Sequence, residues 1–220
     1  MNIASSIDHT FLQPTASIKS IEQICDEARK YHFRAVCVPP LFVKRSKQLL
    51  DESQVRIATV VGFPFGYSAI EAKLAETILA IVDGADEIEV MLNLCAVKNA
   101  DWQYLVKEIG NIMPVIKTNG KSIKIIFETG CLNETEIRTC CDIYGTAGIN
   151  AVKTSTGFSE QGATIDSVKL LRKFLADAIL ISASGSVNTY FFAKQLLDAG
   201  AKTICTENSV EIFNEALQVN

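Results

Sequence analysis

The segment Glu87-Ile-Glu-Val-Met-Leu-Asn93 alternates between apolar and polar side chains. A period of two is typical of a β-strand, because successive side chains of a strand point to opposite faces. Ile88, Val90 and Leu92 form an apolar face that can pack beneath helices. The other face carries Glu87, Glu89, Met91 and Asn93. Buried carboxylates are costly unless they are paired or functional, so the segment predicts a sheet with polar chemistry on its inner face.

Short apolar runs of this kind recur along the chain and alternate with longer amphipathic stretches. They span residues 6–10, 34–38, 55–61, 87–92, 122–128, 151–154, 179–183 and 203–206. Repeated strand–helix units imply parallel strands, because each return to the sheet needs a crossover that covers it. About eight units without a change in composition predict a closed TIM (β/α)₈ barrel of the α/β class, with residues 1–220 as a single domain. An open doubly wound sheet is the alternative.

The stretches between the runs have the apolar spacing of helices. Examples are Ile18, Ile21, Cys25 and Ala28, then Ile70, Leu74, Ile78 and Val82, and then Leu105, Ile109, Ile112 and Ile116. Asn133 before an acidic turn and Gly200 after residues 192–199 are typical helix-boundary signals. The charges of Glu71-Ala-Lys73 are predicted to lie on a solvated helix face.

Composition excludes several classes of function. The chain has 220 residues and a formal net charge of −4, which argues against nucleic acid or an anionic membrane as its main partner. The sequence contains no apolar run of about 18 residues and no signal peptide, so we expect a soluble cytoplasmic protein. Its cysteines are irregularly spaced without a CxxC pair, and only His9 and His32 could join them, so no metal site is predicted.

Polar residues cluster at the ends of the predicted strands, where active sites of barrels lie. Lys153 is in a strand that is covered on both faces, so it cannot be an ordinary solvent-exposed lysine. It is either an amine desolvated enough to attack an aldehyde, or the ion-pair partner of Glu89 or Glu128. Lys124, one strand earlier, would lower the pKa of Lys153 if both point inward, and a Lys124–Glu89 salt bridge can coexist with that role.

Three loops have the composition of binding turns. Thr154-Ser-Thr-Gly157 and Ala183-Ser-Gly-Ser186 offer hydroxyls and backbone amides that suit an oxyanion or phosphate. Ordinary βα turns with capping hydroxyls are the alternative for both. Gly62-Phe-Pro-Phe-Gly66 is typical of a tight loop whose backbone approaches another group closely.

Taken in order, these motifs resemble the deoxyribose-phosphate aldolase family, which consists of class I, Schiff-base aldolases with a TIM-barrel fold. The most specific match is Val152-Lys-Thr-Ser-Thr-Gly-Phe158. The others cover nearly the whole chain: Ile7-Asp-His-Thr10, Val36-Cys-Val-Pro-Pro40, Val60-Val-Gly-Phe-Pro-Phe-Gly66, Asp83-Gly-Ala-Asp-Glu-Ile-Glu89, Ile123-Lys-Ile-Ile-Phe-Glu-Thr129 and Ala183-Ser-Gly185.

The resemblance implies a lyase that cleaves 2-deoxyribose 5-phosphate reversibly to glyceraldehyde 3-phosphate and acetaldehyde, in deoxyribonucleotide catabolism and without a metal or organic cofactor. It implies that Lys153 is the Schiff-base lysine, Lys124 a neighbouring perturbing amine and Glu89 the carboxylate of the proton relay. It places the sugar phosphate or aldehyde against residues near the strand ends, namely Asp8, Thr10, Cys37, Thr154, Thr156, Gly157, Ser184 and Gly185. The expected assembly is a monomer or homodimer.

The chain also departs from the family pattern. Glu89 stands where members usually have the shorter Asp, and Ser182 replaces a second active-site lysine that lowers the pKa of the first. Ser186 replaces a glycine at the expected phosphate site, and Glu207 and Asn208 replace small residues and serines there. At about 4 Å, a glutamate repels a phosphate charge by on the order of 1 to 4 kcal/mol.

Three hypotheses remain open. The leading one is a deoxyribose-phosphate aldolase whose Schiff-base chemistry is retained at Lys153 and whose activity is weakened by the substitutions. The second is an aldolase for a non-phosphorylated aldehyde, motivated by Glu207. The third is a catalytically inactive barrel that binds a metabolite or a protein partner, motivated by Ser182.

Overall fold

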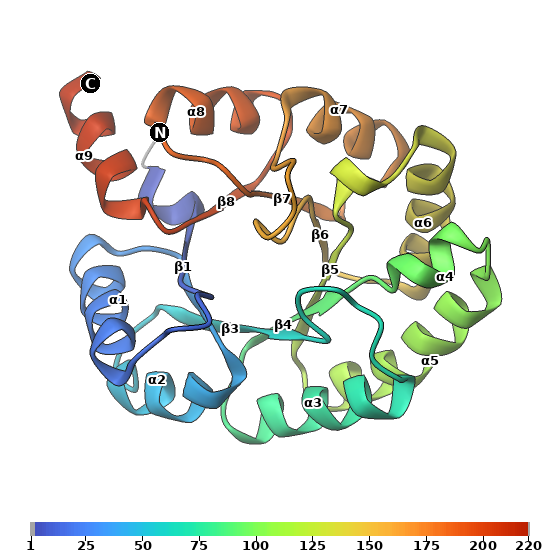
Figure 1. The fold of residues 1–220 in the computed structure, drawn as a ribbon. Coiled ribbons are helices and arrows are strands. Elements are labelled where there is room, and N and C mark those ends of the chain that lie inside the picture. The colour runs from blue at the N-terminus through green and yellow to red at the C-terminus, as the bar shows by residue number, and fades with distance from the viewer. Residues whose placement is uncertain (1–2, 220) are drawn as a thin grey trace.

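The computed structural model describes residues 3–219. Eight parallel strands close into a barrel in sequence order, and helices surround it (Figure 1). The predicted TIM barrel is therefore confirmed, and each predicted run overlaps one strand. The strands are β1 (Ile7–Thr10), β2 (Ala35–Val38), β3 (Arg56–Val61), β4 (Glu87–Met91), β5 (Ser122–Ile126), β6 (Ala151–Lys153), β7 (Leu180–Ser184) and β8 (Thr203–Thr206).

Helices follow the strands as the apolar spacing predicts. Their bounds are α1 (Ile18–Tyr31), α2 (Val43–Leu49), α3 (Ile70–Val82), α4 (Leu94–Lys98), α5 (Trp102–Thr118), α6 (Glu134–Ala147), α7 (Ile165–Phe174), α8 (Tyr190–Asp198) and α9 (Ser209–Val219). Short 3₁₀ segments lie at η1 (Ile3–Ser6), η2 (Pro40–Phe42) and η3 (Thr129–Cys131). Asn133 caps α6 as expected, since its side chain accepts the backbone N–H of Glu136 at 2.9 Å.

The alternation in β4 divides apolar packing into two clusters. Ile88, Val90 and Leu92 belong to the large core between the barrel and the helices. Met91 faces inward and packs in a small interior cluster with Leu12, Cys37, Ala58, Val60 and Ile126. Asn93 follows the end of the strand, where its side chain accepts the N–H of Ala96 at 3.1 Å and caps α4.

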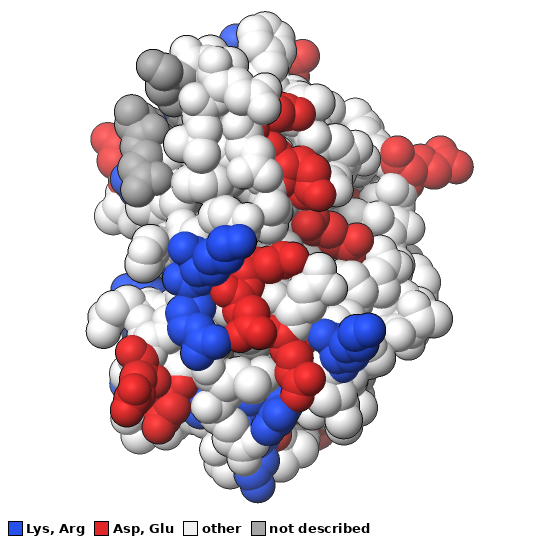
Figure 2. All heavy atoms as spheres, turned by 90° about the vertical axis from the view of Figure 1, so that its left-hand side faces the viewer, with Lys and Arg blue, Asp and Glu red and all other residues white. Residues whose placement is uncertain are grey.

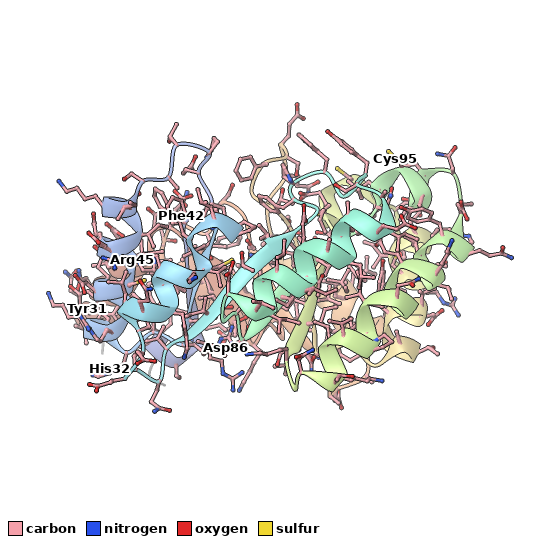
Figure 3. All side chains as sticks on the ribbon, turned by 90° about the horizontal axis from the view of Figure 1, so that it is seen from below. Tyr31, His32, Phe42, Arg45, Asp86 and Cys95 are labelled. Atoms are coloured by element: carbon pink, nitrogen blue, oxygen red, sulfur yellow. The ribbon has the colours of Figure 1, made fainter. Side chains whose placement is uncertain are left out.

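The barrel has two distinct ends. Phe42 and Cys95, which follow β2 and β4, lie toward one end, whereas His32 and Asp86, which precede these strands, lie toward the other (Figure 3). Loops at the first end carry the residues that follow the strands, and we call it the C-terminal mouth. In barrels of this architecture, chemistry occurs at that mouth.

The interior of the barrel carries charge as well as apolar side chains. Arg34 donates from both terminal nitrogens to Glu87, at 2.6 and 2.9 Å, and from Nε to Asp8 at 2.5 Å. Lys124 donates to Asp8 at 2.8 Å and to Glu89 at 2.9 Å. We call these five residues the interior ion-pair network. Each carboxylate in it has a cationic partner, which offsets the cost of burial.

The outer surface carries charges of both signs. On the face formed around α1, acidic side chains lie between clusters of basic ones (Figure 2). Arg45 and Arg29 each pair there with a carboxylate at 2.6 Å, that of Glu22 and Asp26 respectively. Within residues 3–219, no helix has the length and apolar composition needed to cross a membrane.

One prediction about helix charges is wrong. Lys73 of α3 is completely buried, although its sequence neighbour Glu71 is exposed as expected. Its ammonium lies 2.8 Å from the carboxylate of Glu108 on α5. The sequence could not indicate this, because the partner is 35 residues away and on another helix.

The interior ion-pair network predicts loss of stability in acid. Burial by itself raises the pKa of Glu89, but Lys124 and then Lys153 outweigh it and lower the pKa from 4.5 to about 2. A carboxylate with a lowered pKa stabilises the fold above its unfolded pKa, and this contribution is lost as the pH falls toward the folded pKa. We therefore expect Glu89 to account for about 3 kcal/mol of unfolding free energy that disappears between pH 4.5 and 2.

Urea unfolding measured across this pH range tests the expectation. Glu89→Gln should be less stable than the parent at neutral pH and should lose less stability on acidification. The matched control is Glu211→Gln on α9, where the side chain is exposed, and it should retain the parental acid profile. A parental profile in Glu89→Gln would contradict the assignment.

Candidate active site

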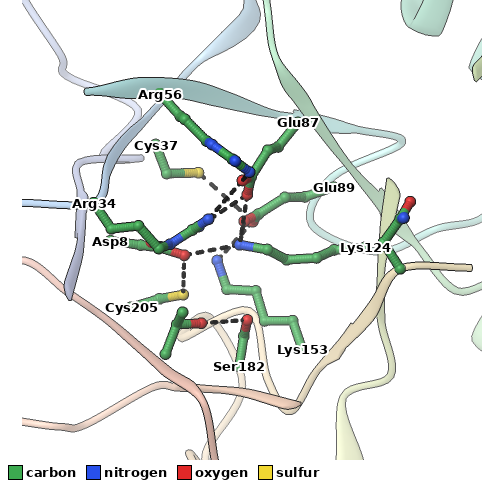
Figure 4. A network of polar contacts seen from close by, with 12 residues as sticks. Asp8, Arg34, Cys37, Arg56, Glu87, Glu89, Lys124, Lys153, Ser182 and Cys205 are labelled. Atoms are coloured by element: carbon green, nitrogen blue, oxygen red, sulfur yellow. Dashed lines mark hydrogen bonds and ion pairs between the residues drawn. The ribbon is translucent and has the colours of Figure 1, made fainter. Parts of the chain in front are cut away.

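Lys153, Lys124 and Glu89 meet inside the barrel, as the sequence predicted for inward-facing side chains. The Glu89 carboxylate accepts from Lys153 Nζ at 2.7 Å through Oε2 and from Lys124 Nζ at 2.9 Å through Oε1 (Figure 4). All three side chains are buried, Lys153 and Glu89 completely. The ion-pair reading of Lys153 is thus confirmed for Glu89, while Glu128 contacts Thr156 instead.

Strand register explains this meeting. Glu89 on β4 is aligned with Lys124 on β5, and Lys153 on β6 is aligned with Ile126, two residues further along β5. Residues aligned across a parallel sheet point to the same face, so all of these side chains enter the barrel. Their convergence requires the closed barrel and does not follow from spacing along the chain.

The pKa of Lys153 agrees with the second of the two interpretations, an ion-paired lysine. Burial by itself lowers the pKa of Lys153, but the acidic groups of Cys205 and Glu89 outweigh it and hold the pKa above its ordinary value. Lys124 acts in the predicted direction and lowers it, but less strongly. The lysine is therefore a charged ammonium in this state, and it must give up a proton before it can act as a nucleophile.

Two thiols lie beside the charged groups. Cys37 Sγ is 3.6 Å from Glu89 Oε2, and Cys205 Sγ is 3.5 Å from Asp8 Oδ2. Ligand atoms of Asp8, Glu89 and Cys205 fall within 4.8 Å of one another, which is a spacing that a metal could use. Both carboxylates already accept from the ammonium of Lys124, so a cationic side chain satisfies this cluster.

Ser182, the predicted substitution of the second lysine, lies next to the candidate nucleophile. It is aligned with Lys153 across β6 and β7 and is buried. Its hydroxyl hydrogen-bonds at 2.6 Å with that of Thr203 on β8. The position therefore contributes a satisfied hydroxyl pair and no positive charge, which leaves Lys124 as the cation beside Lys153.

A cavity of about 490 Å³ opens at the C-terminal mouth, with Cys205 among its lining residues. Many residues predicted from the sequence line it, namely Thr10, Thr156, Gly157, Ser184, Gly185, Ser186, Glu207 and Asn208. Ser184 is aligned with Cys205, whose other strand neighbour, Asp8, accepts from Lys124. The cavity thus lies next to the charged groups of the barrel interior.

Three predicted substrate-binding residues do not line this cavity. Asp8 and Cys37 are completely buried and contact charged groups of the interior. Thr154 is buried behind the wall, where its hydroxyl donates to the Ser184 carbonyl at 3.1 Å and accepts from the Ser184 N–H at 3.0 Å. From these positions Asp8 and Cys37 contact the charged residues of the interior, and Thr154 holds the backbone of the cavity wall.

The cavity wall contains backbone in the left-handed region. Gly157, Gly185 and Ser186 have φ values of 84°, 91° and 58°. Gly162 is also required here, since a Cβ on it would lie 2.3 Å from the carbonyl oxygen of Gly185. Glu128 fixes the first loop by accepting the Thr156 N–H at 3.1 Å and the Thr156 hydroxyl. Turns of this kind present backbone N–H groups to an anion.

The side chains of the wall are uncharged apart from one carboxylate. Lysine, arginine and histidine are absent from the residues that line the cavity in the described part of the chain. Glu207 is exposed at its rim, where Gln13 Nε2 donates to Glu207 Oε1 at 2.8 Å. Asn208 donates to the Asn188 side chain at 2.8 Å. A dianion here would depend on backbone N–H groups and hydroxyls.

Sequence reasoning missed several groups of the site. Arg34 and Arg56 both pair with Glu87. They precede or begin their strands, and only the barrel shows that their guanidinium groups reach this buried carboxylate, Arg56 from an exposed position. Gln13 and Cys205 were missed because one is in a loop and the other resembles a buried apolar residue. An inward carboxylate at Glu87 without an obvious partner was the one signal that could have pointed to the arginines.

Comparisons with known proteins agree with this geometry. The family model of DeoC/LacD aldolases matches residues 3–205. The chain is 41% identical over 216 residues to a deoxyribose-phosphate aldolase of Caldanaerobacter subterraneus subsp. tengcongensis, covering 98% of this chain and 94% of that one. It is 42% identical over 214 residues to one of Caldicellulosiruptor saccharolyticus, covering 97% of each.

A solved structure supports the same grouping. The deoxyribose phosphate aldolase of Aeropyrum pernix, described as uniquely tetrameric, superposes with a TM-score of 0.92 at 27% identity. The match covers 99% of this chain and 92% of that one. The agreement of sequence, fold and interior residues leads to one conclusion: the chain belongs to the DeoC/LacD family of aldolases.

Proposed function

We propose that the protein cleaves 2-deoxyribose 5-phosphate by a retro-aldol reaction through a Schiff base on Lys153. The observation that carries this proposal is the buried lysine paired with Glu89 beside a polar cavity. Relatives at about 40% identity over nearly the whole chain have the same activity in their names. A lysine amine is the group that forms an imine with an aldehyde without any cofactor.

Proton transfer must come first, because the resting lysine is an ammonium. Glu89 Oε2 lies 2.7 Å from Lys153 Nζ and is the nearest base. The freed amine attacks C1 of the open-chain sugar. The carbonyl oxygen takes up one proton from the attacking nitrogen and one from Glu89 and leaves as water, which gives a protonated imine. This cation again pairs with the Glu89 carboxylate. Lys124 favours the ionised form of Glu89, so Glu89 holds the proton only in passing and gives it up as water leaves.

Carbon–carbon cleavage then uses the imine as the electron sink. The C3 hydroxyl gives its proton to the Glu89 carboxylate as the C2–C3 bond breaks, and C3 leaves as the aldehyde of glyceraldehyde 3-phosphate. The bond electrons form an enamine on C1 and C2. Glu89 returns this proton to C2, and a water molecule then hydrolyses the imine, which releases acetaldehyde and restores the lysine. Complete burial of Lys153 protects these intermediates from bulk water.

Borohydride trapping tests the lysine. Incubation with acetaldehyde and sodium borohydride should place one N-ethyl group on Lys153, located by peptide mass mapping. Lys153→Met should carry no adduct within the barrel and should lose at least about a thousandfold in kcat. The exposed Lys169 of α7 offers the matched control, and Lys169→Met should be labelled like the parent. If the parent remains unlabelled under conditions that label an active family member, the inactive binding barrel is favoured instead.

A second candidate function is the same chemistry on a non-phosphorylated aldehyde. Glu207 and the absence of a cation from the described cavity wall favour it. The exposed position of Glu207 weakens the repulsion of a phosphate, because solvent screens the charge. The expected penalty is therefore at the low end, about 1 kcal/mol. This would reduce the affinity for the phosphorylated sugar without excluding it.

Glu207→Gln distinguishes the two substrates, because the amide can keep the contact with Gln13. We expect kcat/KM for 2-deoxyribose 5-phosphate to rise about fivefold at low salt, and that for 2-deoxyribose to change less than about twofold. Inorganic phosphate should inhibit the variant more strongly than the parent. Glu211→Gln again serves as the control. Parental values for the phosphorylated sugar in Glu207→Gln would show that this carboxylate does not face the phosphate.

A further inference from the structure

Lys73 is a buried cation that lies outside the barrel interior. It is on α3, and its Nζ donates to the carbonyl of Met91 at 2.7 Å and to Glu108 Oε1 at 2.8 Å. Glu108 comes from α5, and both side chains are almost completely inaccessible. Met91 is the last residue of β4 and is aligned with Ile126, which is in turn aligned with Lys153. The ammonium therefore anchors the end of β4 at the position along the barrel axis where Lys153 lies.

The Gly62–Gly66 loop rests directly on this lysine. A Cβ on Gly62 would lie 2.6 Å from Lys73 Cε, so only glycine lets the backbone approach the stem so closely. The Gly62 N–H donates to Glu76 at 2.6 Å, and the Gly66 N–H closes the loop onto the Gly62 carbonyl at 2.8 Å. At the other side, a Cβ on Gly66 would lie 1.9 Å from the carbonyl oxygen of Leu92. The loop is thus held between α3 and the end of β4.

This loop carries an aromatic ring to the active site. Phe63 packs on the interior apolar cluster that contains Met91 and Ile126. Its ring also meets that of Phe158 edge to face, with centroids 5.3 Å apart. Phe158 follows Lys153 by five residues and lines the cavity. A continuous chain of contacts therefore runs from Lys73 through Phe63 to the cavity wall.

The buried pair is not explained by stability. Burial lowers the pKa of Lys73, although Glu108 opposes that effect. Burial likewise raises the pKa of Glu108, against the opposing effect of Lys73. Both directions mean that the charged pair is disfavoured by its surroundings, and well-packed apolar residues often replace such pairs without loss of stability. What an apolar residue cannot supply is the directed bond to the Met91 carbonyl.

We propose that Lys73 is a positioning residue for the retro-aldol reaction, because with Glu108 it fixes the end of β4 and the Gly62–Gly66 loop and so holds Phe63 against Phe158. The proposal rests on the proposed function for its kinetic consequence. A purely structural ion pair would instead affect folding alone. The two roles differ in the effect of removing both charges together. A structural pair predicts that kcat/KM recovers along with stability, whereas a positioning role predicts that kcat/KM stays low.

The first experiment compares Lys73→Met with the double variant Lys73→Met/Glu108→Leu. The single variant leaves a buried carboxylate without its partner, so its Tm should fall by about 10 °C. The double variant should recover most of that loss. Its kcat/KM for 2-deoxyribose 5-phosphate should nevertheless stay at least about tenfold below the parent, with both a lower kcat and a higher KM. Lys194→Met removes a solvent-exposed pair with Asp198 and should retain parental values.

A double-mutant cycle with Phe63→Ala tests the route of action. If Lys73 acts through Phe63, the triple variant Phe63→Ala/Lys73→Met/Glu108→Leu should lose much less transition-state free energy than the sum of the two separate losses. Each loss is calculated from kcat/KM. Full recovery of kcat/KM in the double variant, or additive losses in the cycle, would overturn the proposal.

A readout without turnover separates this proposal from the proposed function. Cys205 lines the cavity, whereas Cys141 on α6 is buried in the large apolar core and serves as an internal reference. Iodoacetamide should modify Cys205 several times faster in Lys73→Met/Glu108→Leu and in Phe63→Ala than in the parent, with Cys141 still protected. Faster labelling together with an unlabelled Lys153 in the borohydride test would keep the positioning role and reject the aldolase mechanism. Unchanged Cys205 labelling in the double variant would reject the positioning role even in an active aldolase.

Discussion

The buried Glu89 carboxylate, shared between two ammonium groups, is the interaction on which the rest of the site depends. Lys124 and Lys153 approach its two oxygens at 2.9 and 2.7 Å inside the barrel, where all three side chains are buried. Two lysines alone would repel each other there, and a lone carboxylate would take up a proton. Together they form an arrangement that is stable while folded and that places a base beside the amine.

This arrangement needs support from the N-terminal side of the barrel. Lys124 also pairs with Asp8, and Arg34 connects Asp8 to Glu87. Removing one partner from such a network leaves another buried charge uncompensated, so its members depend on one another. The resting state consequently stores Lys153 as an ammonium. The proposed Schiff-base mechanism therefore includes transfer of the Lys153 proton to Glu89 as one of its steps.

The cavity wall differs from the barrel interior in its polar groups, because it has almost no charged side chains. Its wall relies on glycine-rich turns, hydroxyls and backbone N–H groups, and the only charge on the described wall is that of Glu207. If the proposed sugar substrate binds here, shape and backbone dipoles recognise it, and Glu207 at the rim sets the charge preference. Ser182 follows the same trend, because a hydroxyl pair with Thr203 fills a place where the family resemblance implies a lysine.

The sequence by itself determined the barrel, the family and the inward direction of Glu89, because strand periodicity and ordered motifs are local properties. Whether Lys124 and Lys153 also point inward was left open by the sequence, and the strand register of the closed barrel decided it. Only the tertiary structure decided which charges pair and in which direction the pKa of Lys153 moves. It also showed that Lys73 is buried and that Asp8 supports the lysines away from the cavity wall. These outcomes depend on the strand register around a closed barrel and on contacts between helices. Both join residues that are far apart in the chain, so they leave no periodic signal in the sequence.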